Sequence, residues 1–222
     1  MMSDIDKEAL SQLRSPRAAA INGILFAVLS ITVMFFVQDL VTAKPADVNQ
    51  EWLKSNFNTA SRAIMLTPVI GITFLWFTAV LRDWLVDWED RFFSTVFFGS
   101  GILFVAMFFV WAGTFGALFS TYGAVKDKII DEDFLVFGFM FMNQILGNYT
   151  MRMMGVYMSS IATIWALTAV MPRWIVVITY ILAIALLLFA GLLAEVRFAF
   201  PCWVLFVSVY ILVFNYRRPK SG

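Results

Sequence analysis

Apolar residues fill six long blocks of the chain, and polar stretches separate them. The blocks are Ala18–Val37, Ala63–Leu81, Phe92–Tyr122, Phe134–Met171, Trp174–Ala194 and Phe198–Tyr216. A membrane helix needs about 20 mostly apolar residues at about 1.5 Å each, and the blocks do not alternate between apolar and polar residues as barrel strands do. The pattern therefore predicts an all-α fold, a polytopic transmembrane helical bundle with about six spans.

The two ends of the chain differ from these blocks. Residues 1–17 are polar and mixed in charge, residues 18–216 form one transmembrane domain, and residues 217–222 form a basic tail. The first block is longer than a signal-peptide core, and no small-residue cleavage site follows it. We therefore expect this block to be a membrane helix that the mature protein retains.

The Lys and Arg residues between the blocks predict the orientation. With six spans both termini share one side, which carries nine Lys and Arg residues against six on the other side. Positive charge is in excess on cytoplasmic loops. We expect a multi-pass protein of the plasma (inner) membrane with both termini in the cytoplasm.

The longest connection, Gln38–Arg62, is polar, and the other connections are short. Within it, Glu51–Phe57 fits a short interfacial helix, because aromatic residues such as Trp52 and Phe57 favour the headgroup region. We expect this helix to be separate from the second span.

The fourth block is too long for one span. Its 38 residues would extend roughly 57 Å as one helix, whereas the hydrocarbon core is about 30 Å thick. Phe134–Gly147 alone is too short to cross. Two arrangements are open: a long helix that protrudes from the bilayer, or an interfacial or re-entrant segment that turns at Gly147-Asn148.

Polar and small residues form a stripe along this block. Their spacing places them within an arc of about 100°, one face of a helix; they are Gln144, Asn148, Arg152, Gly155, Ser159 and Thr163. Arg152 is the only charge well inside an apolar block, and such residues usually face a bundle interior or an aqueous cavity. We predict that a pore or ligand site is lined by Gln144, Asn148, Arg152, Ser159 and Thr163.

Two other interpretations of the stripe stay open. In the first, Arg152 marks the membrane surface and reaches the headgroups, while Ser159 and Thr163 make ordinary bonds between helices. In the second, Arg152 pairs with an acid only to fix the fold. The acids considered for that pair are Asp39, Asp83 and Glu195.

An acidic turn joins the second and third blocks and carries Asp83, Asp87, Glu89 and Asp90. Its three aspartates would share one face of a helical turn, and carboxylates so placed can hold Mg²⁺ against a diphosphate. We favour a solvated cytoplasmic loop whose acids lie near the start of the next helix, where negative charge is stabilised. We therefore expect no catalytic residue and no metal here.

Composition narrows the classes of function. Hydrophobic residues make up 61% of the chain and charged residues 14%, against about 45–50% and 25% in soluble domains. The net charge of +1 gives no basic field for nucleic acid, so no nucleic-acid partner is expected. The chain has no histidine and one cysteine, Cys202. This excludes His-ligated metals, disulfides within the chain and Cys-ligated clusters, and we expect no cofactor.

Four short motifs stand out between the second and sixth blocks. They are Phe74-Leu75-Trp76-Phe77, the turn from Arg82-Asp83 to Glu89-Asp90-Arg91-Phe92-Phe93, Met151-Arg152-Met153 leading to Met158-Ser159-Ser160, and Pro172-Arg173-Trp174. In these motifs the chain resembles a family of uncharacterised bacterial integral membrane proteins. The resemblance implies six spans and no particular activity, because that family has no established function.

These features favour a membrane channel or transporter for a small ion or solute, with anions favoured because Arg152 attracts them. The alternative is a non-catalytic membrane subunit or scaffold of a larger complex. A third hypothesis is a Mg-dependent lipid-modifying enzyme. The expected partners are the lipid bilayer and either a second copy of the chain or another membrane protein.

Overall fold

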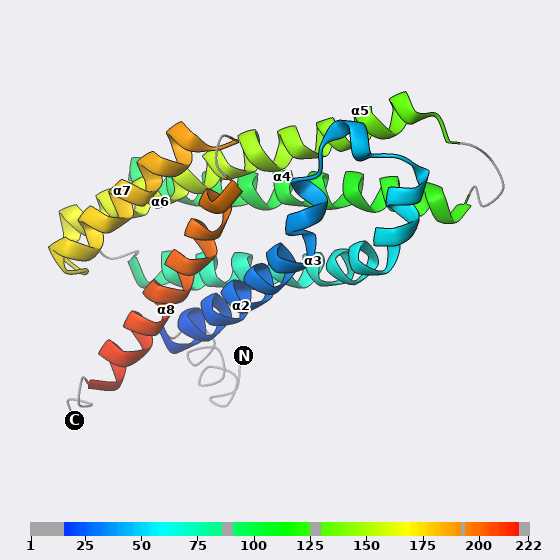
Figure 1. The fold of residues 1–222 in the computed structure, drawn as a ribbon. Helices are drawn as coiled ribbons and strands as arrows, with labels where there is room; N and C mark the ends of the chain where they lie inside the picture. The colour runs from blue at the N-terminus through cyan, green and yellow to red at the C-terminus, as the bar shows by residue number, and fades with distance from the viewer. Residues whose placement is uncertain (1–15, 86–90, 125–129, 192–193, 218–222) are drawn as a thin grey trace, which may run out of the picture.

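The computed structural model describes residues 16–85, 91–124, 130–191 and 194–217, and no strand occurs within these ranges. The helical elements, in chain order, are α2 (Pro16–Val41), η1 (Pro45–Asp47), α3 (Gln50–Leu85), α4 (Arg91–Ala124), α5 (Glu132–Gln144), η3 (Ile145–Thr150), α6 (Met151–Thr168), α7 (Arg173–Phe189), η4 (Ala194–Phe198) and α8 (Ala199–Arg217). The predicted all-α bundle is confirmed (Figure 1).

Four helices of the described part are long and apolar enough to cross a membrane. These segments are Arg17–Val41, Gln50–Asp83, Phe92–Ala124 and Glu195–Val213. A fifth apolar helix, Arg173–Phe189, is shorter. The chain is therefore a helical membrane protein, and the count of six spans stays a prediction.

The polar start of α3 differs from the prediction. Glu51–Phe57 is helical, but it is part of α3 and not a separate interfacial helix. The Asn49 side chain accepts a hydrogen bond from the Trp52 amide (2.9 Å), which satisfies one of the free N–H groups at the helix start. Leu53 is fully buried, so packing holds these first turns in line with the apolar part of the helix.

The fourth block is one continuous helix, so the arrangement with a turn at Gly147-Asn148 is wrong. α5 passes into α6 through η3, a π-helical turn, and the residues at both of its ends keep right-handed helical angles. The Thr150 hydroxyl donates to the Ile145 carbonyl (2.8 Å), five residues earlier. A π turn inserts one extra residue without ending the helix.

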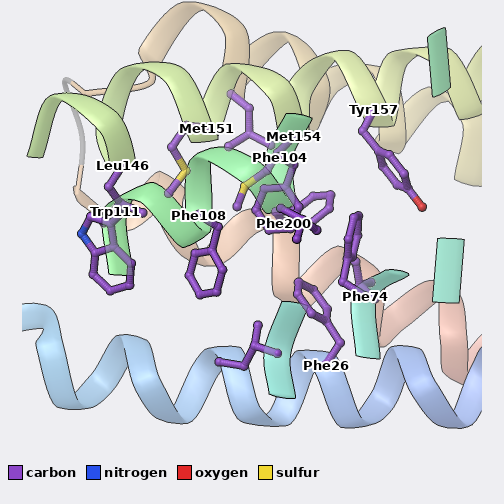
Figure 2. Packing of buried hydrophobic residues seen from close by; sticks show 14 of the residues in the cluster. Phe26, Phe74, Phe104, Phe108, Trp111, Leu146, Met151, Met154, Tyr157 and Phe200 are labelled. Atoms are coloured by element: carbon purple, nitrogen blue, oxygen red, sulfur yellow. The ribbon is translucent and has the colours of Figure 1, made fainter. Parts of the chain in front are cut away.

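The helices form two packed groups that α3 and α4 join. α2 contacts α3 and α8, whereas α6 lies between α4 and α7 (Figure 1). Five aromatic side chains meet where the groups touch, and we call them the aromatic cluster: Phe26, Phe74, Phe104, Tyr157 and Phe200 (Figure 2). Each of the five is at most 2% exposed.

Three of the helical segments extend well past the others. α3 has 36 residues and α4 has 34, while α7 and α8 have 17 and 19. The start of α3, the end of α4 and α5 pack together beyond the ends of the shorter helices (Figure 1). Trp52 holds this extension together, with its ring centroid 5.4 Å from that of Phe119 and 6.0 Å from that of Phe139.

Pro68 lies inside α3 and cannot donate a bond to the carbonyl of Ile64, four residues earlier. The Thr67 hydroxyl donates to that carbonyl instead, at 2.6 Å. In the bilayer core no water is present to donate a hydrogen bond to a free carbonyl. This side chain therefore lets a proline stand inside a membrane helix.

Replacing Thr67 by valine, which has the same shape, is expected to lower the free energy of unfolding by about 1 kcal/mol, because the Ile64 carbonyl loses its donor. Reversible unfolding in mixed detergent micelles measures the effect. Thr73→Val is the matched control: Thr73 is also buried, but its hydroxyl bonds carbonyls within regular helix. Equal losses in the two variants would contradict this explanation.

Candidate internal cavity

A narrow cavity runs through the bundle between α2 and the helices that face it. Side chains from α2, α3, α4, η3, α6, η4 and α8 line it. The lining residues are Phe26, Ser30, Val33, Met34, Val37, Gln38, Val41, Thr42, Ile70, Phe104, Phe108, Trp111, Leu146, Met154, Arg197, Phe198 and Pro201. The centre of a water molecule could occupy about 40 Å³ of it.

The two ends of the cavity differ in polarity. Along α2 the lining runs from Phe26 to Thr42, a distance of about 24 Å at 1.5 Å per residue. At one end of this run the side chains of Gln38 and Thr42 are exposed. Arg197 lies toward the same end, since the ring of its neighbour Phe198 is 5.3 Å from that of Phe35. The other end is apolar and stops at Phe26 and Phe104, which belong to the aromatic cluster (Figure 2).

Among the described residues that line the cavity, Arg197 is the only charged one. It lies in η4, the short turn before α8, and is partly buried. Within the described part of the chain its guanidinium has no hydrogen-bond or ion-pair partner, although the charge of Glu195 acts on it. An arginine without a described partner beside an apolar cavity can offer its five N–H donors to an anion.

Two buried polar atoms of the cavity wall are also unpaired. The Ser30 hydroxyl and the Trp111 indole nitrogen have no hydrogen-bond partner among the described residues, and both residues line the cavity. Buried polar groups usually have a partner, in the protein or in ordered water. The wall therefore holds two polar atoms without a described partner in an otherwise mainly apolar lining.

The aromatic cluster closes the inner end. Phe104 lies 4.7 Å from Phe74 and 5.4 Å from Phe200, measured between ring centroids. Tyr157 lies 5.2 Å from Phe74, and its hydroxyl is 3.1 Å from the Thr78 hydroxyl. Tightly packed rings leave no space for water, so the cavity is open toward Arg197 and shut at its inner end.

In the first half of the predicted stripe, Gln144 and Arg152 are exposed and Asn148 is half-buried. Gln144, Asn148 and Arg152 form a chain of hydrogen bonds: the Asn148 amide donates to the Gln144 side chain, and Arg152 donates to the Asn148 side chain at 3.1 Å. Arg152 is exposed. No ion pair joins it to Asp39, Asp83 or Glu195, all of which the structure describes.

The second half of the stripe contacts α7. A Cβ atom on Gly155 would lie 3.0 Å from the backbone oxygen of Ala183, and the Thr163 hydroxyl is 2.7 Å from that of Tyr180. Ser159 donates to a carbonyl of its own helix. None of the stripe residues lines the cavity described above, and their role in a path or ligand site stays a prediction.

Of the acidic turn, Asp83 lies at the end of α3 and is exposed. Asp87, Glu89 and Asp90 lie outside the described residues. In the described ranges no group of three His, Cys, Asp or Glu side chains could hold a metal ion.

Sequence reasoning did not single out Arg197, because Glu195 and Arg197 read as a short loop. The lining residues come from seven elements far apart in the chain, and no spacing rule connects them. The one local feature of the sequence that points to Arg197 is its position between two apolar blocks, with no excess of acidic residues around it.

No protein-family model, no curated protein and no solved structure matches this chain. The resemblance to bacterial membrane proteins therefore stays an expectation.

Proposed function

We propose that this protein is a membrane transport protein for a small solute, with anions favoured, and that the cavity is where the solute binds. We further propose that it lies in the plasma (inner) membrane with both termini in the cytoplasm. The observation that carries the proposal is Arg197 at the open end of a cavity inside the bundle, where its guanidinium has no partner among the described residues.

The charges around the cavity support an anion over a cation. Arg197 supplies positive charge in a partly buried place, where Coulomb attraction is stronger than in water. The described lining includes no Asp or Glu, the residues that would favour a cation or relay a proton there.

The closed inner end is what we expect of one state in an alternating-access transport cycle. A solute can reach the cavity from the Arg197 end, but the aromatic cluster stands between it and the opposite side. Transport then requires Phe26 and Phe104 to move apart. Apolar constrictions of this kind control passage in channels by excluding water.

Flux in liposomes tests the proposal, with chloride, acetate and potassium gradients measured separately. Wild type is expected to move the anions and not potassium. Arg197→Gln is expected to lower anion flux about tenfold or more, because a hydrogen bond to a charged group contributes about 1.5–3 kcal/mol. Arg173→Gln, at the exposed start of α7, is the matched control and should leave flux unchanged.

A third variant, Arg152→Gln, separates the cavity from the stripe. Loss of flux in this variant alone would place the path along the stripe, as the sequence predicts. If wild type moves none of the three ions, the transport proposal is wrong for these solutes.

A membrane subunit or scaffold is the second candidate, and one observation favours it. The extension presents exposed aromatic side chains on α5, with Phe134 at 54%, Phe137 at 68% and Phe141 at 42% exposure. Small residues and rings on helix surfaces are used for association between membrane helices. A scaffold would co-purify with a membrane partner, or a second copy, at fixed stoichiometry.

The lipid-modifying enzyme stays a third hypothesis. Its test is Mg²⁺ binding by wild type and by a variant in which Asp83 and Asp87 are both asparagine.

A further inference from the structure

The dimensions of the cavity limit what can lie in it. Averaged over the about 24 Å that its lining covers along α2, the roughly 40 Å³ of room for water centres gives a mean width of about 4 Å. This is the width of one hydrocarbon chain, since carbon atoms in contact are separated by about 3.5–4.0 Å. Two chains side by side, or a fused ring system, are too wide.

The cavity wall is apolar over most of its length, as a hydrocarbon chain is. Between the two ends the cavity wall is made mainly of aliphatic and aromatic side chains, such as Val33, Ile70 and Phe108. Removing methylene groups from water is worth about 0.8 kcal/mol each, although a ligand that comes from lipid gains less.

The polar end fits an acidic headgroup. The Arg197 guanidinium has no partner in the described part of the chain, and Gln38 and Thr42 lie at the same end of the cavity. An arginine binds a carboxylate through two parallel hydrogen bonds. Met34 and Met154 on opposite walls have flexible side chains that can adapt to a chain of slightly different thickness.

We propose that the cavity binds a free single-chain amphiphile with an acidic headgroup, such as a fatty carboxylate. Its chain lies along α2 toward Phe26, and its headgroup is held by Arg197. This inference rests on the proposed function in one respect, since it names the class of solute that the transporter would carry. Binding is measured without flux, so each can fail while the other stands.

The test measures binding of hexadecanoate labelled with ¹³C at the carboxyl carbon to the purified full-length protein in an uncharged detergent. Wild type is expected to bind one hexadecanoate per chain, with a shifted carboxyl signal. Arg197→Gln is expected to weaken that binding about tenfold or more while leaving the binding of uncharged hexadecanol unchanged. Equal affinity of wild type and Arg197→Gln for the acid would overturn the proposal.

A second variant tests the position of the chain. Val33 is buried midway along the cavity wall, so Val33→Phe is expected to block hexadecanoate but still admit octanoate. Val28→Phe, on the exposed face of the same helix, is the control and should bind both. Hexadecanoate binding that survives Val33→Phe would place the ligand elsewhere on the protein.

Further outcomes distinguish a free amphiphile from a membrane lipid, and the binding proposal from the transport proposal. If phospholipid in mixed micelles displaces hexadecanoate at equal concentration, the occupant is one chain of a membrane lipid, and the proposal of a free amphiphile is wrong. Should Val33→Phe fail to fold, the preference of wild type for longer over shorter carboxylates decides, and no preference contradicts a tube along α2. Chloride flux without any hexadecanoate binding leaves transport standing and removes this inference, whereas binding without flux does the reverse.

Discussion

Replacing Phe74 by alanine is expected to lower the free energy of unfolding by about 3–5 kcal/mol, the range for large aromatic side chains in well-packed cores. Phe74 is fully buried, and four other members of the aromatic cluster lie within 6 Å of its ring centroid: Phe26 at 5.0 Å, Phe104 at 4.7 Å, Tyr157 at 5.2 Å and Phe200 at 5.7 Å. These residues come from α2, α4, α6 and α8, so one truncation loosens five helices at once.

The expected loss of stability comes mainly from lost van der Waals contacts and less from the hydrophobic effect. In lipid the hydrophobic effect does not hold helices together, and van der Waals packing does most of that work. A void left by the ring removes those contacts from every neighbour.

Unfolding of the Phe74→Ala variant in mixed micelles, followed by tryptophan fluorescence, measures the effect. Phe137→Ala is the control, since that ring is 68% exposed, and it should cost less than about 1 kcal/mol. A small loss for Phe74→Ala would show that the helices close over the void.

Replacing Gly155 by valine is expected to separate α6 from α7 and to destabilise the bundle by about 1–3 kcal/mol, the usual cost of overpacking. A Cβ atom there would lie 2.8 Å from Leu187 Cγ and 3.0 Å from the Ala183 backbone oxygen. A backbone oxygen cannot move away by a rotamer change as the end of a side chain can, so α6 or α7 has to shift as a whole.

Gly113→Val is the matched control for this variant. Gly113 also lies in a long apolar helix, but a Cβ atom there meets nothing within 4 Å, so we expect little loss or a slight gain from helix propensity. The distance between spin labels on α6 and α7 reports the separation directly. An unchanged distance together with unchanged stability would show that Gly155 is not the contact that sets this helix pair.

The helices themselves could be predicted from the sequence, because the bilayer requires long apolar segments with all backbone bonds satisfied internally. The block Phe92–Tyr122, for example, corresponds to α4, Arg91–Ala124. The continuity of Glu51–Phe57 with the rest of α3 was not predicted, since Trp52 and Leu53 hold these polar first turns against other helices. Local hydropathy does not register such tertiary contacts.

The candidate site was less predictable than the fold. The stripe was found because its residues share one helix and follow its period. The cavity was not, because Ser30, Trp111 and Arg197 come from three elements and meet only after the helices pack. Ser30 and Trp111 each look ordinary in the sequence, and their unpaired polar atoms become visible only when their burial is known.

The unequal helix lengths also shape the lipid around the protein. α4 extends about 51 Å and α7 about 26 Å, whereas the hydrocarbon layer is about 30 Å thick. Lipids beside a short helix thin, while beside a long one they thicken or the helix tilts, at a fraction of a kcal/mol per ångström. A protein whose α4 does not tilt would therefore thicken a uniform bilayer beside α4 and thin it beside α7. The elastic energy of that deformation is lowest at a boundary between a thin and a thick membrane region, which would concentrate the protein there without any binding partner.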